Sequence, residues 1–77
     1  MKNFENVIKA SHIARADGAR VTELPNSLTI TGFAFQVQDF FKACRDNGFE
    51  LEDETITRSI PTFKYFDGTY HILVYLL

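Results

Sequence analysis

The chain has 77 residues, of which 45% are hydrophobic and 14% aromatic, and its formal net charge at pH 7 is −2. A chain of this length supports one hydrophobic core, so we expect a single domain over residues 1–77, and the composition is that of a globular rather than a disordered protein. Cys44 is the only cysteine. This excludes an internal disulfide, and one cysteine with two histidines falls short of a structural zinc site. Eight Phe and three Tyr residues must therefore supply much of the core.

The N-terminal residues lack the apolar run of a secretory signal, and no stretch reaches the ~18 apolar residues of a membrane span. Residues 71–77 are densely apolar but too few to cross a bilayer as a helix. A single unpaired thiol suits a reducing compartment. We therefore expect a cytoplasmic protein without a membrane segment.

Two amphipathic helices are predicted. The first runs over residues 4–17, with Asn3 as its N-cap and Gly18 as its end, and the second over residues 35–47, ending before Gly48. Each carries apolar or small side chains at offsets of three and four residues, which indicates one buried face. These are Phe4, Val7, Ile8, Ser11 and Ala14 in the first helix, and Val37, Phe40, Phe41 and Cys44 in the second.

Strands are predicted before and after the second helix. Residues 20–24 and 28–31 form a hairpin, and β-forming residues follow at 49–51, 55–60, 63–66 and 69–75. Between 51 and 55 the pattern is interrupted by acidic residues. Pro61 lacks an N–H group and is expected at a strand edge, a bulge or a break. The fold class is therefore α+β, an antiparallel sheet of four to five strands packed by two helices in the order α-β-β-α-β-β-β.

Asp67-Gly68 is the strongest turn signal, and it predicts a two-residue type I′ hairpin. The predicted register pairs Phe66 with Thr69, Tyr65 with Tyr70, and Phe63 with Ile72. One face of the hairpin then carries Phe63, Tyr65, Tyr70, Ile72 and Val74, and the other Lys64, Phe66, His71, Leu73 and Tyr75. Because both faces of the last strand are apolar, we expect it to be central and covered on both sides, by helices or by another subunit.

The sharpest charge feature is an acidic cluster of four residues: Glu50, Glu52, Asp53 and Glu54. Residues 46–77 carry a net charge of −4, and residues 1–45 carry +2. A clustered negative surface can bind a protein that presents a basic surface, and we assign the cluster this role. Two other interpretations remain open, a solvated loop or an edge that discourages strand pairing, and a divalent-cation site, although the spacing does not fit a calcium loop.

Catalytic chemistry has no clear candidate in the sequence. Cys44 lies on the buried stripe of the second helix, where a thiol acts as a small hydrophobic group, and His12 and His71 have no neighbour at metal-ligand spacing. A domain this small also has little surface for a cleft. We expect no enzyme activity, no cofactor and no metal.

The predicted C-terminal hairpin offers an alternative binding surface that combines cationic and aromatic residues: Arg58, Lys64, Tyr65, Phe66 and Tyr70. Such a combination is used to stack and neutralise single-stranded nucleic acid. The net charge of the chain and the adjoining acidic cluster argue against this use, and the same aromatics serve equally well as cross-strand pairs.

We therefore expect a small, non-enzymatic protein-binding module whose partner carries a basic surface. One form of such a module is a phage or mobile-element inhibitor that occludes a host nuclease or defence complex, as anti-CRISPR-type antagonists do. The alternatives are a small nucleic-acid-binding domain that uses the surface around Arg58, Lys64 and Tyr65, and a homo-oligomeric structural or accessory subunit, such as a homodimer formed through the C-terminal strand.

Overall fold

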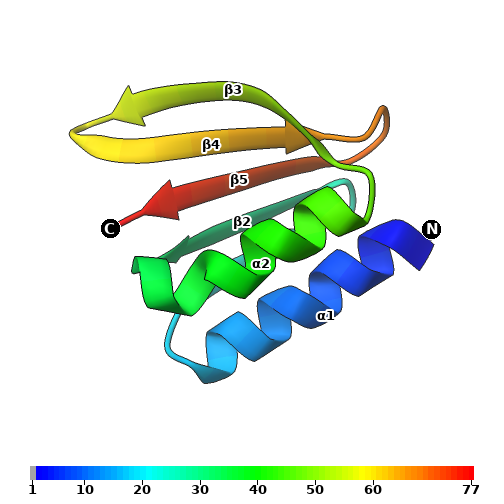
Figure 1. The fold of residues 1–77 in the computed structure, drawn as a ribbon, viewed down its shortest axis with the longest axis horizontal. Coiled ribbons are helices and arrows are strands. Elements are labelled where there is room, and N and C mark those ends of the chain that lie inside the picture. The colour runs from blue at the N-terminus through cyan, green and yellow to red at the C-terminus, as the bar shows by residue number, and fades with distance from the viewer. Residues whose placement is uncertain (1) are drawn as a thin grey trace.

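A computed structural model describes residues 2–77 and confirms the predicted fold class, a small α+β domain with the order α-β-β-α-β-β-β (Figure 1). The helices are α1 (Lys2–Ala16) and α2 (Ala34–Asp46). The strands are β1 (Arg20–Leu24), β2 (Ser27–Gly32), β3 (Glu50–Thr57), β4 (Ile60–Phe66) and β5 (His71–Leu76).

The five strands form one sheet in the order β1-β2-β5-β4-β3. Neighbouring strands are antiparallel except β2 and β5, which run parallel from the Ser27–His71 pair to the Gly32–Leu76 pair. The sheet is therefore mixed, although mostly antiparallel as predicted. β5 lies at its centre, between β2 and β4, in agreement with its apolar composition.

Both helices pack on the same face of the sheet (Figure 1). The expectation that β5 would be covered on both sides is therefore met on one side only within this chain. On the helix side, Ile30 and Val74 are paired across β2 and β5 and are fully buried, as is Val37 of α2. The opposite face, which we call the open face, carries His71, Leu73 and Tyr75 of β5.

The predicted helix faces are confirmed, whereas the predicted cap is wrong. Phe4, Val7, Ser11 and Ala14 are buried, but α1 begins at Lys2, so Asn3 lies within the helix instead of capping it. In α2, Val37, Phe40 and Cys44 are buried and Phe41 is half-buried.

Polar contacts tie the helices to their neighbours in the chain. Gln36 accepts a hydrogen bond from the Phe33 N–H at 2.8 Å and donates one to the Asp17 carbonyl at 2.9 Å, which joins the start of α2 to the end of α1. Gly18, at φ +104°, makes the left-handed turn that ends α1.

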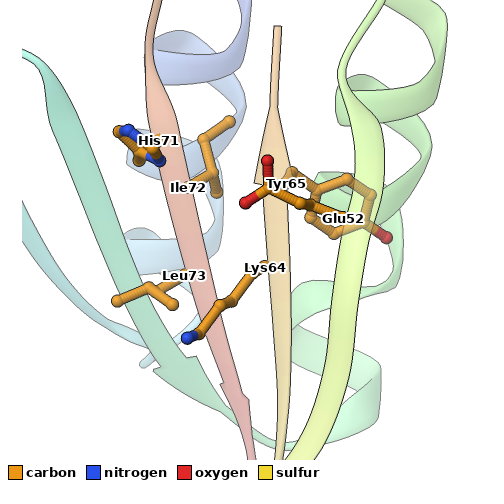
Figure 2. Close-up of a pocket in the computed structure, with 6 residues that line it drawn as sticks. All are labelled: Glu52, Lys64, Tyr65, His71, Ile72 and Leu73. Carbon is orange, nitrogen blue, oxygen red and sulfur yellow. The ribbon is translucent and has the colours of Figure 1, made fainter.

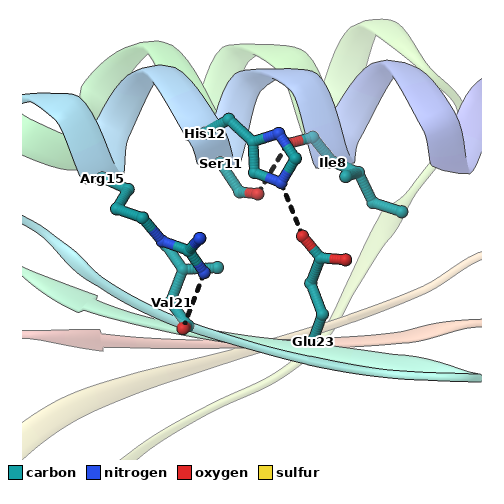
Figure 3. A network of polar contacts seen from close by, with 6 residues as sticks. All are labelled: Ile8, Ser11, His12, Arg15, Val21 and Glu23. Carbon is teal, nitrogen blue, oxygen red and sulfur yellow. Dashed lines mark hydrogen bonds and ion pairs between the residues drawn. The ribbon is translucent and has the colours of Figure 1, made fainter.

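A second set of contacts joins α1 to β1 (Figure 3). His12 lies 2.6 Å from Glu23, and the Arg15 guanidinium donates to the Val21 carbonyl at 3.1 Å. The buried Ser11 hydroxyl donates within the helix to the Ile8 carbonyl at 2.6 Å, so its burial leaves no hydroxyl without a partner.

The predicted two-residue turn at Asp67-Gly68 is wrong, because β4 and β5 are joined by four residues. The Asp67 carboxylate accepts hydrogen bonds from the backbone N–H groups of Thr69 and Tyr70, which holds a wider turn. Phe66 therefore pairs with His71, and Tyr65 with Ile72. The register differs from the predicted one by two residues, an even number, so each strand residue still faces the predicted side.

Two-residue turns occur elsewhere in the sheet. Thr57 pairs with Ile60 across Arg58 and Ser59, both of which have positive φ (51° and 70°), as a type I′ turn requires. β3 runs continuously through the acidic cluster, which corrects its interpretation as a solvated loop. Pro61 lies inside β4, opposite Ile56, and pairing with β5 begins only at the next residue. Proline has no backbone N–H, and Pro61 lies just outside the part of β4 that pairs with β5, so no hydrogen bond between these strands is lost.

Candidate protein-interaction surface

β3 is the most exposed element of the sheet. It forms one edge, and all eight of its residues are exposed, including the two large apolar ones, Leu51 at 47% and Ile56 at 71%. By contrast, β2 alternates buried and half-buried residues along its whole length. Exposed apolar side chains on an edge strand are typical of a surface that another molecule covers.

The four acidic residues all lie on β3 but are divided between its two faces. Glu50 pairs with Phe66, and Asp53 with Lys64, so both lie on the open face. Glu54 pairs with Phe63 and lies on the helix side. The division arises from a bulge between Leu51 and Asp53, which adds one residue, Glu52, to the strand.

None of these carboxylates takes part in an ion pair within residues 2–77, where the pairs are His12 with Glu23 and Lys42 with Asp46. Asp53 instead accepts a hydrogen bond from the N–H of its neighbour Glu54 at 2.9 Å. The cluster therefore lies on a solvated strand that forms no salt bridge, with Lys64 as the cross-strand neighbour of Asp53.

A shallow cavity of about 290 Å³ lies against β3, β4 and β5. Figure 2 shows the residues that line it, which are Glu52, Lys64, Tyr65, His71, Ile72 and Leu73. Lys64 and Leu73 are direct cross-strand neighbours there, and the His71 ring stacks on Phe66 with centroids 4.4 Å apart. The volume is at the lower limit for small-molecule sites, so the cavity is best described as a local depression in the open face.

The residues of the alternative surface do not share one face. Lys64 and Phe66 lie on the open face and Arg58 in the adjoining turn. Tyr65 points to the helices and is buried, and burial is the main cause of its raised pKa. Tyr70 stacks on Phe4 with centroids 4.0 Å apart. Both tyrosine rings are thus engaged in the core, and neither offers a free ring for a base to stack on.

The remaining reactive side chains occupy structural positions. Cys44 is buried, and desolvation raises the pKa of its thiol to about 12 despite the opposing effect of Arg45, so it is held as a thiol at neutral pH. No three His, Cys, Asp or Glu side chains gather into a metal site in the described part of the chain. Neither α1 nor α2 has the length and apolar character needed to cross a membrane.

The sequence did not predict the exposure of Leu51 and Ile56 on β3, nor that of two aromatic rings at the start of α2. Phe33 and Phe35 are 53% and 67% exposed and stack on each other with centroids 6.3 Å apart. A signal exists for the second pair, since residues two apart at a helix start cannot both face the sheet. For Leu51 no signal existed, because its side of the strand depends on the bulge.

Comparison of the chain with protein-family models, with curated proteins and with solved structures finds no match.

Proposed function

We propose that this protein is a small non-enzymatic protein-binding module that presents β3 to a basic surface of another protein. The observation that carries the proposal is the exposure of all eight residues of β3, on a sheet edge where four carboxylates form no salt bridge with the described residues. Like charges held on one strand repel one another in the free protein, and a basic partner relieves that repulsion.

The module would act by occlusion. A basic surface on a nuclease or a defence complex normally contacts phosphate groups, and an acidic strand that covers it would compete for the same site. This action fits a cytoplasmic inhibitor encoded by a phage or a mobile element. Occlusion of this kind requires no catalytic group.

The test is a charge reversal on β3. A partner is first captured from lysate of the source cells with nuclease treatment, so that contacts bridged by nucleic acid are lost. The Glu52→Lys/Glu54→Lys variant should then associate about tenfold more slowly at low salt and lose most of the salt dependence of its association rate. Both positions are exposed, so the variant should remain folded.

The matched control is Glu5→Lys/Asp39→Lys, which makes the same change in net charge at exposed positions on the two helices. It should slow association much less, because local charge rather than total charge governs the encounter. An unchanged rate and salt slope in the β3 variant would contradict the proposal. Tighter binding of that variant to a single-stranded oligonucleotide would favour the nucleic-acid alternative.

A second candidate function, a homo-oligomeric subunit, is favoured by the open face of the sheet. Leu73 and Tyr75 of β5 and Phe66 of β4 are half-buried there without a covering layer in this chain. A two-fold pairing of open faces would cover them. Light scattering over a micromolar dilution series tests this, and a monomeric mass at every concentration would exclude it.

A further inference from the structure

The side chains of the open face form rows that cross all five strands. Along the cross-strand pairs from β1 to β3, the middle row is Thr22, Thr29, Leu73, Lys64 and Asp53. Leu73 is half-buried and lies at the middle of this row, on the central strand. The centre of the face is therefore apolar, and the strands on its two sides can be compared position by position.

The two strands beside β5 differ in the size of their open-face side chains. On β2 these side chains are all small, and they are Ser27, Thr29 and Thr31. On β4 the larger Lys64 and Phe66 occupy the positions across β5 from Thr29 and Ser27. The small Thr62 of β4 is already buried, next to Tyr75. The face is thus raised on the β4 side and lowered on the β2 side.

The charges of the open face are also divided between its two edges. Glu50 and Asp53 lie on β3, with Glu52 near them at the depression, and Arg20 lies on β1 at the opposite edge. Lys64 is the cross-strand neighbour of Asp53, but its side chain extends the other way, over β5 (Figure 2). Because the face carries charges of both signs, a uniformly basic surface does not complement it.

A second copy of this chain complements both patterns when a two-fold axis runs along β5. This axis places β2 of one copy over β4 of the other, and β1 over β3. The small side chains of β2 then meet the large ones of β4, which closes the gap between the sheets. Asp53 lies opposite Thr22, and Arg20 is the next open-face residue of β1, roughly 7 Å along the strand. An arginine side chain spans that distance.

A two-fold axis that runs across the strands is a poorer arrangement. It places each strand over its own counterpart, so Lys64 meets Lys64 and Asp53 meets Asp53. Like charges in such positions repel one another. The small side chains of the two β2 strands would also face each other and leave a gap.

The size of the face sets the strength of such a dimer. Five strands and six residues per strand give a face of roughly 24 by 20 Å, so two copies would bury about 1,000 Å² in total. This area is at the lower limit for a specific interface. We therefore expect a weak dimer that dissociates at micromolar concentrations.

We infer that the open face binds a second copy of this chain, with the two-fold axis along β5 and Arg20 of each copy beside Asp53 of the other. The inference rests on the second candidate function, the homo-oligomeric subunit, and specifies its interface. Glu54 and the exposed Leu51 and Ile56 lie on the helix side of β3. They stay outside this interface, so the dimer is compatible with binding of another protein.

Cysteine crosslinking distinguishes the two axes. Cys44 is buried and does not compete with cysteines introduced on the surface. A short bifunctional maleimide should crosslink an equimolar mixture of Thr29→Cys and Lys64→Cys about ten times faster than Thr29→Cys alone. The matched control is a mixture of Glu5→Cys and Asp39→Cys, at exposed positions on the helices, which should crosslink only slowly. Faster crosslinking of Thr29→Cys alone would place the axis across the strands and overturn the inference.

Charge exchange tests the contact between Arg20 and Asp53. Arg20→Glu and Asp53→Arg each bring like charges together, so each should raise the dimer Kd about tenfold in sedimentation measurements. An equimolar mixture of the two variants should recover the parent Kd within about twofold, because both contacts then join opposite charges. A mixture that dimerises no better than the separate variants would contradict the assigned contact.

The outcomes also separate this inference from the proposed functions. A parent chain that stays monomeric at millimolar concentration overturns both the inference and the homo-oligomeric candidate. A dimer that survives Leu73→Asp, which places two carboxylates at the axis, overturns the inference alone. The protein-binding function is judged independently, by the effect of Glu52→Lys/Glu54→Lys on the captured partner.

Discussion

The two halves of the sheet use their apolar residues differently. In β2 and β5 the helix-side residues lie under α1 and α2, and Leu28, Ile30, Ile72 and Val74 are almost inaccessible. In β3 the residues on the same side are exposed. Burial of apolar area is the main source of folding stability. The covered half therefore stabilises the fold, and β3 is free to change its sequence without large effects on stability.

The largest expected difference between the two halves is in the stability lost when an apolar side chain is truncated. Phe40→Ala removes a ring that is 1% exposed and should cost about 3–5 kcal/mol, enough to unfold a domain of this size. Ile56→Ala, at 71% exposure, should change the free energy of unfolding by less than about 0.5 kcal/mol. Chemical denaturation measures both, and similar losses in the two variants would show that β3 belongs to the core.

A smaller effect is expected at alkaline pH. The pKa of Cys44 is about 12 in the folded protein and 9.0 as the ordinary value. Above pH 9 the unfolded chain loses this proton while the folded one keeps it, so stability falls as the pH rises. The loss should be on the order of 1 kcal/mol at pH 10. Cys44→Ala should be less stable at pH 7 but should lack this part of the alkaline loss, as denaturation at both pH values would show.

The smallest effect is expected for the surface contact between α1 and β1. His12 and Glu23 are both about half exposed although their atoms lie 2.6 Å apart. Such pairs contribute at most about 1 kcal/mol, so Glu23→Gln should cost about 0.5 kcal/mol or less in thermal or chemical denaturation. A loss above 2 kcal/mol would mean that polar contacts, and not burial alone, hold the covered half together.

The local elements could be read from the sequence because their signals are short-range. The stripe of Val37, Phe40 and Cys44 predicts the buried face of α2, and the β1–β2 hairpin has nearly the predicted bounds. The two-residue turn predicted at Asp67-Gly68 was wrong because hydrogen bonds to the Asp67 side chain, and not a type I′ backbone, determine the loop. The prediction of which side chains of β4 and β5 share a face was nevertheless correct, because the register differs from the predicted one by two residues, an even number.

The long-range features could not be read in the same way. Parallel pairing of β2 with β5 joins segments far apart in the chain, and no residue pattern distinguishes it from an antiparallel alternative. The four carboxylates were found, but their division between two faces depends on the bulge at Glu52, which has no sequence signal. The exposure of Leu51 and Ile56 follows from where the helices lie, which is a property of the assembled domain.

The central position of β5 has a consequence for the order of folding. β1–β2 and β3–β4 are hairpins with two-residue turns and can form early, but they do not pair with each other. Both wait for β5 (residues 71–76), the last of the five strands in chain order, to insert between them, a closure that joins distant parts of the chain and is intrinsically slow. Before that insertion β3 and α2 belong to separate pieces. The core is therefore completed, and β3 joined to the rest of the sheet, in one late event.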